Sequence, residues 1–171
     1  MRSLLDRVNN PLHLLIALAC AWLVASSPWI GLYQALPDEP GALDLGHVVV
    51  GLAVLPLAIV YCAACTVGGR WRLYFPWAAG QFGDIGRDLA GIGQGQRPGS
   101  EGGGLFATVE GLLLLALLAT ALTGALWFLG RGTEAAIAWR GHHIIAARGL
   151  TGLLVLHVIA VSLHFVDLVR D

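Results

Sequence analysis

Residues 142–165 read HHIIAARGLTGLLVLHVIAVSLHF, an apolar run that predicts a membrane-spanning helix and yet contains four histidines. His143 and His157 are fourteen residues apart, which on an α-helix places them within roughly 40° of one face and about 21 Å apart along the axis. Ionisable side chains are costly in lipid and are therefore candidates for function. Two nitrogen ligands at two depths of one face indicate two stacked metal cofactors, whose other ligands must lie elsewhere in the chain.

The composition indicates an integral membrane protein. Of the 171 residues, 57% are hydrophobic and 12% are charged, whereas a soluble domain carries about 25% charged residues. All ten basic residues are arginines, and the formal net charge is −1. This balance provides no basic face for nucleic acid, so membrane lipid is the expected surrounding and nucleic acid is not an expected partner.

Four apolar segments are long enough to cross about 30 Å of hydrocarbon, which takes about 20 helical residues. We expect spans over residues 11–32, 45–67, 105–129 and 142–166, with a return loop over 130–141. The connection 69–104 is polar, and it is expected to hold a short amphipathic helix over 84–92 and a Gly-rich linker over 93–104. The sequence thus predicts an all-α, integral membrane, four-helix up-down bundle, with residues 1–171 as a single domain.

The first segment has a competing interpretation as a cleaved signal peptide. Arg2 and Arg7 precede its apolar core, and Ala25-Ser26-Ser27 follows it. The length of the run, Asp6 in the leader and His13 within the core favour a retained helix.

The distribution of arginines predicts the orientation, because cytoplasmic loops carry an excess of basic residues. Two arginines, Arg131 and Arg140, fall on one side of the predicted topology. Seven fall on the other side: Arg2, Arg7, Arg70, Arg72, Arg87, Arg97 and Arg170. Both termini are therefore expected in the cytoplasm.

The three cysteines lie within apolar runs. Cys62 and Cys65 form a C-x-x-C pattern that histidine does not follow, so c-type haem attachment is not predicted. Small apolar fillers are the favoured interpretation of these cysteines, ahead of a redox or metal-binding pair.

In this topology the histidines fall into two pairs by depth. His47 and His143 lie near the outer ends of the second and fourth spans, while His13 and His157 lie toward the cytoplasm on the first and fourth. Two axial imidazoles saturate a haem iron and suit it to electron transfer. Half-solvated histidines at helix ends are the plainer interpretation of any one of them, and zinc is disfavoured because each pair offers only two ligands.

Several motifs resemble the bacterial cytochrome b561 family, which includes b-type cytochrome subunits of nickel-iron hydrogenases. They are Asn10-Pro-Leu-His13, Leu45-Gly-His47-Val-Val-Val-Gly51, His143 with Leu156-His157, and His164-Phe165. The resemblance implies two haem b groups, with His47 and His143 as axial ligands of the outer one and His13 and His157 as ligands of the inner one.

Some alternatives for these ligands stay open. His142 precedes His143, and His164 follows His157 by seven residues, only about 20° around a helix. The family often has tryptophan after the first-span histidine, where this chain has Leu14. Arg148 is expected to neutralise a haem propionate or to line the outer haem edge, with a snorkelling interfacial arginine as the alternative.

The expected function is electron transfer across a bacterial inner membrane by a multi-pass protein, between quinol or quinone and a redox partner. No Ser-His-Asp or Cys-His constellation is evident, and no catalytic residue is assigned. One alternative is a haem-bearing anchor subunit of a hydrogenase- or dehydrogenase-type complex, with residues 69–104 or the outer loops as docking surface. Another is a haem-free small transporter or a structural membrane protein.

Overall fold

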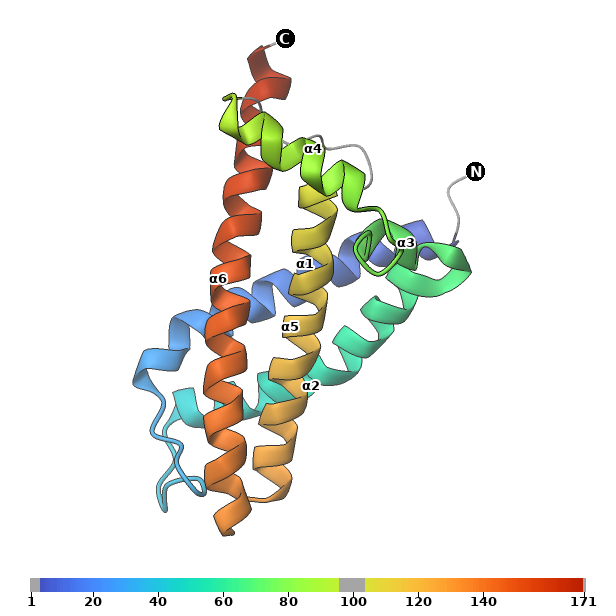
Figure 1. Ribbon diagram of the computed structural model, residues 1–171. Helices are drawn as coiled ribbons and strands as arrows, with labels where there is room; N and C mark the ends of the chain where they lie inside the picture. Colours follow the sequence, from blue (N-terminus) through green and yellow to red (C-terminus); the bar gives the residue numbers. More distant parts are fainter. Residues whose placement is uncertain (1–3, 96–103, 171) are drawn as a thin grey trace. The chain divides into compact units, whose positions relative to one another are not determined.

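The chain is all-helical over the residues that the computed structural model describes, 4–95 and 104–170, with side chains described for 11–95 and 104–162 (Figure 1). This confirms the predicted fold class. The elements are α1 (Leu4–Ser26), η1 (Ser27–Trp29), α2 (Ala42–Thr66), η2 (Val67–Gly69), α3 (Trp71–Tyr74), α4 (Phe82–Gly93), α5 (Gly104–Leu129) and α6 (Glu134–Arg170).

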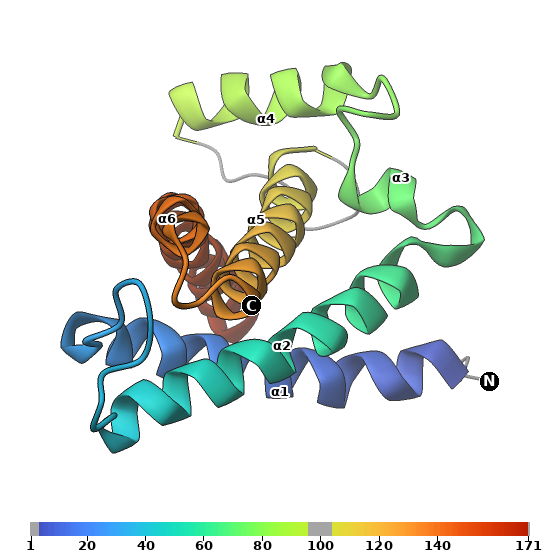
Figure 2. The ribbon, with the colours of Figure 1, turned by 90° about the horizontal axis from the view of Figure 1, so that it is seen from below.

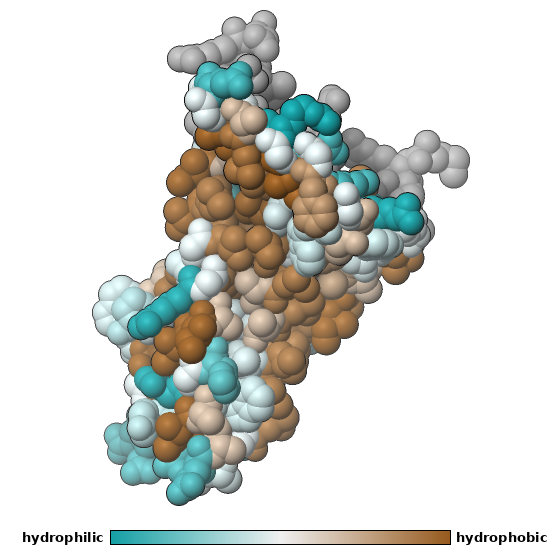
Figure 3. Space-filling view, viewed as in Figure 1, coloured by the Kyte–Doolittle hydropathy of each residue, from teal (hydrophilic) through white to brown (hydrophobic). Residues whose placement is uncertain are grey.

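Four helical stretches are long and apolar enough to cross a membrane, as predicted. They cover Pro11–Trp29, Ala42–Gly69, Gly104–Leu129 and Glu134–Ser162. Large aliphatic side chains point outward from them; Leu18 is 62% exposed and Ile145 is 70% exposed. Figure 3 shows hydrophobic residues over much of the face that it presents. Such a surface suits contact with lipid, where apolar exposure carries no penalty.

The prediction of a return loop over residues 130–141 is wrong, because α6 begins at Glu134 and only Gly130–Thr133 make the turn. Ala135-Ala136-Ile137-Ala138 are mostly strong helix formers, and Glu134 in the first turn favours the helix dipole. At the other end of the chain, α1 begins at Leu4 and ends at Ser26, where Pro28 follows within η1. His143 therefore lies more than two turns inside α6 rather than at its beginning.

The chain divides into two compact units, which are described separately. The first comprises residues up to Ala64 together with Ala116–Leu150, and the second comprises Cys65–Leu115 together with the residues from Thr151 onward. In the first unit α1 and α2 form an antiparallel hairpin and lie side by side in both ribbon views (Figures 1 and 2). A Cβ at Gly46 would lie 2.8 Å from the indole of Trp22, so glycine lets these two helices approach closely.

Small side chains line the interior of the first unit. Ala58 and Ala136 are fully buried, and Ala121 and Ala125 of α5 are nearly so. Close packing of small residues is how helices associate in lipid, where burial of apolar surface gives no driving force between helices. At these four positions a small side chain lets the helix backbones approach closely.

Asp44 joins both ends of the α1–α2 connection. Its carboxylate accepts hydrogen bonds from the backbone N–H of Gly31 (2.8 Å) and of Gly41 (3.1 Å), and only 9% of the residue is exposed. The bond to Gly41 is the reach of an acidic N3 side chain back to the N-cap residue. Asp44 thus caps α2 and fixes the chain that leaves α1.

In the second unit, the connection between α2 and α5 folds onto the start of α5. A Cβ at Gly111 would collide with the carbonyl oxygen of Tyr74, so the turn after α3 rests directly on the α5 backbone. The predicted short helix is confirmed as α4, at Phe82–Gly93. The predicted Gly-rich linker lies largely at 96–103, outside the described residues.

We expect Asp44→Ala to lower the free energy of unfolding by about 1–2 kcal/mol, because two backbone N–H groups lose the charged acceptor that the buried carboxylate provides. Asp38→Ala removes an exposed carboxylate from the same connection and should change it little. Thermal unfolding in detergent, followed by circular dichroism, measures the difference. Equal midpoints for the two variants would contradict this role of Asp44.

Candidate functional site

His47 of α2 and His143 of α6 meet inside the first unit. Their ring centroids are 6.4 Å apart, and the ring planes are nearly perpendicular, at 88°. Both side chains are only partly exposed. The structure therefore brings together one of the two histidine pairs predicted from depth along the spans.

The Nδ1 atom of His143 is held by α5. It lies 3.0 Å from the carbonyl oxygen of Thr120 and 3.4 Å from the hydroxyl of Thr123. A carbonyl oxygen only accepts hydrogen bonds, so Nδ1 of His143 carries the proton and donates it. The lone pair of this neutral ring is then on Nε2, which is the nitrogen left to bind a metal.

The Nδ1 atom of His47 is held by α1. It lies 3.4 Å from the hydroxyl oxygen of Ser26, which is buried and donates its own proton to the carbonyl of Leu23 (3.2 Å). With its proton so used, the hydroxyl oxygen of Ser26 is an acceptor for the N–H of His47. His47 thus offers Nε2 as its metal-binding nitrogen, as His143 does.

Gly124 of α5 gives the ring of His143 its space. A Cβ built at Gly124 would lie 3.2 Å from both Cε1 and Nδ1 of His143. The absence of a side chain there lets the imidazole lie against the helix backbone of α5.

The spacing of the two rings fits a single metal ion between them. Two imidazoles bound to one metal through nitrogen bonds of about 2.0–2.1 Å have ring centroids about 6.3 Å apart when the arrangement is linear. The observed separation is 6.4 Å. Hydrogen bonding of the outer ring nitrogen is also the usual support of a metal-binding histidine. The residues of this site therefore fit a metal with two axial histidines, such as a haem iron.

The other predicted pair falls in two different units, so its pairing stays a prediction. His13 of α1 is exposed, and its ring stacks on Tyr61 of α2 with centroids 5.8 Å apart. His157 of α6 is half-buried, and its ring stacks on Phe106 of α5, also at 5.8 Å. Each histidine thus has an aromatic neighbour within its own unit.

The less certain candidates all lie on α6. His142 is exposed, and its ring contacts the edge of Trp139 at a centroid distance of 5.5 Å. Arg148 is exposed. The backbone of His164 belongs to α6, but its side chain lies outside the described residues.

Sequence reasoning missed the residues that orient the histidines and those that hold the loop beside them. Ser26 carries a hydroxyl in an apolar helix, a signal that could have marked it, but the carbonyl of Thr120 leaves no trace in sequence. Arg140 donates to the carbonyl of Leu32 (2.8 Å) and lies over the ring of Tyr33 (5.2 Å). Trp127 donates to the carbonyl of Tyr33 (2.8 Å).

The second unit contains a separate polar cluster, in which Tyr74 lies outside the candidate spans and contacts groups at the ends of α2 and α5. Burial, the hydrogen-bonded thiol of Cys65 and the nearby carboxyl of Glu110 raise the pKa of Tyr74 to about 12. The phenol therefore stays protonated at any physiological pH. It acts as a neutral hydrogen-bonding group between the turn after α3 and the membrane spans.

Comparison with known proteins gave one match. Residues 5–168 match the family described as prokaryotic cytochrome b561. No curated protein and no solved structure matched the chain. The family match covers all four candidate spans and agrees with the resemblance found in the histidine motifs.

We expect Gly124→Val to lower the haem bound per chain, because its side chain would occupy the space of the His143 ring. Gly141→Val is the matched control, since Gly141 is exposed on α6 and a Cβ there meets nothing within 4 Å. The absorption spectrum of each purified variant, normalised to protein, gives the haem content. Full haem content in Gly124→Val would show that His143 does not need this approach to α5.

Proposed function

We propose that this chain, which belongs to the prokaryotic cytochrome b561 family, carries electrons across the membrane through two b-type haems, each held by two histidines. Membership of the family already implies transmembrane electron transfer by b-type haem in a multi-pass membrane protein. The number of haems, the ligand pairs and the electron donor and acceptor go beyond that membership. They form the content of the proposal, with residues 1–171 acting as one di-haem domain.

The observation that carries the proposal is the pairing of His47 with His143. Their centroid separation and the hydrogen bonds at both Nδ1 atoms support these residues as the two axial ligands of the outer haem. A bound haem supplies a reversible one-electron change at its iron. With both axial positions taken by nitrogen, no position is left for substrate, which favours electron transfer over oxygen or substrate chemistry.

The residues around this pair have distinct tasks. Ser26 and the Thr120 carbonyl hold the two rings in the tautomer that presents Nε2. The small residues of α5 let the helices close around the pair and exclude water. Arg148, one and a half turns beyond His143 on α6, is proposed to neutralise a propionate or to line the outer haem edge.

For the inner haem we propose His13 and His157. The support comes from the family motifs, in which a first-span and a fourth-span histidine recur, and from the spacing of His143 and His157 along α6. The stacking of His13 on Tyr61 and of His157 on Phe106 shows that each ring already has one flat apolar neighbour. His164 is the alternative to His157 here, as His142 is the alternative to His143 at the outer haem.

We further propose that both termini face the cytoplasm of a bacterial inner membrane. Arg70, Arg72 and Arg87 all lie in the connection between α2 and α5, whereas Arg131 and Arg140 lie beside the opposite turn, between α5 and α6. The excess on the first side supports a cytoplasmic position for it. The outer haem would then lie toward the periplasm and the inner one toward the cytoplasm.

The proposed electron donor or acceptor on one side is the quinol/quinone pool, with a redox protein as the other partner. The runner-up is a haem-bearing anchor subunit that works only when docked to a hydrogenase- or dehydrogenase-type enzyme. Both proposed functions use the same haems. They differ in whether the isolated chain exchanges electrons with quinol.

We predict that His47→Ala and His143→Ala each remove the same haem, and that His13→Ala and His157→Ala each remove the other. Each variant should retain about half of the haem of the parent chain, since only one iron loses an axial ligand in each. Haem content per chain combined with a redox titration identifies which of two potentials is lost.

His142→Ala and His164→Ala are the matched controls. Each removes a nearby histidine of α6 that the proposal does not assign as a haem ligand. Both should keep the full haem content. Loss of one haem in His164→Ala together with two haems in His157→Ala would overturn the inner assignment. A parent chain without b-type absorption bands would overturn the whole proposal and leave a haem-free transporter or structural protein.

We expect the purified parent chain in liposomes to become reduced on addition of a soluble quinol analogue, within the time of a stopped-flow experiment. Its visible spectrum reports the reduction directly. The His47→Ala and His13→Ala variants, each lacking one haem, serve as controls for direct reduction of a single centre. A fully haem-loaded chain that quinol does not reduce would favour the anchor subunit.

A further inference from the structure

Helix α4 has one apolar face and one polar face, and most of the large side chains on the apolar face are exposed. Its large hydrophobic residues, Phe82, Ile85, Leu89 and Ile92, fall within about 80° of one another around the helix. Three of them are well exposed: Phe82 at 65%, Leu89 at 55% and Ile92 at 47%. An exposed stripe of this kind marks an interaction surface rather than a chance arrangement.

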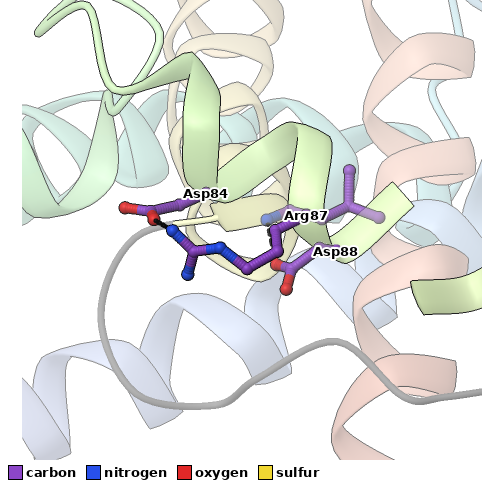
Figure 4. A network of polar contacts seen from close by, with 4 residues as sticks. Asp84, Arg87 and Asp88 are labelled. Carbon is purple, nitrogen blue, oxygen red and sulfur yellow. Dashed lines mark hydrogen bonds and ion pairs between the residues drawn. The ribbon is translucent and has the colours of Figure 1, made fainter. Parts of the chain in front are cut away.

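The charged residues lie outside this stripe: Arg87 is opposite its centre, and Asp84 and Asp88 lie along one flank. Arg87 and Asp84 form an exposed ion pair at 2.8 Å, and Asp88 lies one residue further along (Figure 4). This separation of charge from apolar residues is typical of helices that lie along a membrane surface. By itself it leaves the partner of the apolar face undetermined.

A hydrogen bond from α5 determines the depth of α4. The carboxylate of Asp88 accepts the backbone N–H of Leu105 at 2.8 Å, at the first turn of the membrane span Gly104–Leu129. A Cβ at Gly104 would collide with that same carboxylate, so α4 and the end of the span are in close contact. Asp88 is thus a cap for α5 supplied from another helix, and a carboxylate there is also favoured by the helix dipole.

Since α5 enters the hydrocarbon at this turn, the bond holds α4 at the level of the lipid headgroups. On the helix, Asp88 is only about 40° from Ile92, at the edge of the apolar stripe. The exposed stripe therefore lies next to the side of α4 that contacts the end of α5. We therefore propose that α4 is an interfacial helix whose Phe82, Leu89 and Ile92 side chains insert between the lipids beside α5.

The start of the same connection has the composition of a membrane interface as well. Trp71 and Leu73 of α3 are exposed, and the guanidinium of Arg72 lies 5.6 Å from the centroid of the Trp71 ring. Tryptophan and arginine are the residues that anchor helices at the headgroup level. The part of this connection that the structure describes, up to Gly95, then lies along the membrane surface, independently of how many haems the chain binds.

Spin labels test this proposal in the full chain reconstituted into lipid nanodiscs. The parent carries Cys20→Ala, Cys62→Ala and Cys65→Ala and is accepted only if its haem spectrum is unchanged. Single cysteines are then placed on the apolar face by Phe82→Cys and Leu89→Cys, and on the polar face by Arg87→Cys as the matched control. Relaxation by oxygen, which concentrates in lipid, is compared with relaxation by a water-soluble nickel chelate.

We expect the ratio of oxygen to nickel accessibility at positions 82 and 89 to be several-fold that at position 87. Equal ratios at all three positions would place α4 in water and overturn the proposal. Protection of positions 82 and 89 from both reagents would also overturn it, because a protein partner or a second copy of the chain would then cover the face. A second variant, Asp88→Ala, removes the acceptor of the Leu105 N–H and should lower the ratio at 82 and 89 if the bond to α5 sets the depth of α4.

Discussion

Buried polar nitrogen atoms in a lipid environment need partners, and this requirement governs the arrangement of the first unit. An imidazole ring has two nitrogens, and an unpaired one in an apolar interior costs several kcal/mol, on the order of a lost hydrogen bond or more. For His47 and His143 the outer nitrogen is satisfied by Ser26 of α1 and by the Thr120 carbonyl of α5. In each ring Nε2 is then the nitrogen left for a metal, which is the basis for proposing the two residues as axial ligands. The close approach at Gly124 and the clamp made by Asp44 serve the same end, since both keep the helices at the spacing that these short bonds require.

Much of this arrangement could be predicted from the sequence because lipid simplifies the problem. A span must be apolar and about 20 residues long, so four spans and an all-helical fold follow from composition and length. A histidine inside such a span is conspicuous, and matching His47 with His143 needed only their depths in an alternating topology. The same argument for His13 and His157 has equal force in sequence, but those residues belong to separate compact units. Their pairing therefore rests on their depths in the sequence and on the family motifs.

The rest could not be predicted, for physical reasons that differ from residue to residue. The start of α6 was misplaced because Arg140 and Gly141 resemble loop residues, whereas the alanines before them continue the helix. Arg140 is accommodated there through the carbonyl of Leu32 and the ring of Tyr33, which are distant in sequence. The partner of the His143 Nδ1 atom is a backbone carbonyl, and every residue has one. A pattern of side chains identifies which residues are unusual, but it does not show which backbone atoms satisfy them.

Helix α6 holds candidate ligands of both haem sites, and its regularity is therefore part of the function. It runs from Glu134 to Arg170 as a single helix without proline, whereas α1 and α2 contain Pro11 and Pro56. A proline removes a backbone hydrogen bond and bends a helix. Each residue added or lost between His143 and His157 would turn the second histidine by about 100° relative to the first. The two prolines thus lie in helices that each hold one proposed ligand. In α6, which holds two, the regular helix fixes the angle between the two histidines around its axis. Electron transfer between two centres depends on their separation, and a continuous helix is the simplest way for a small protein to set that separation by residue count.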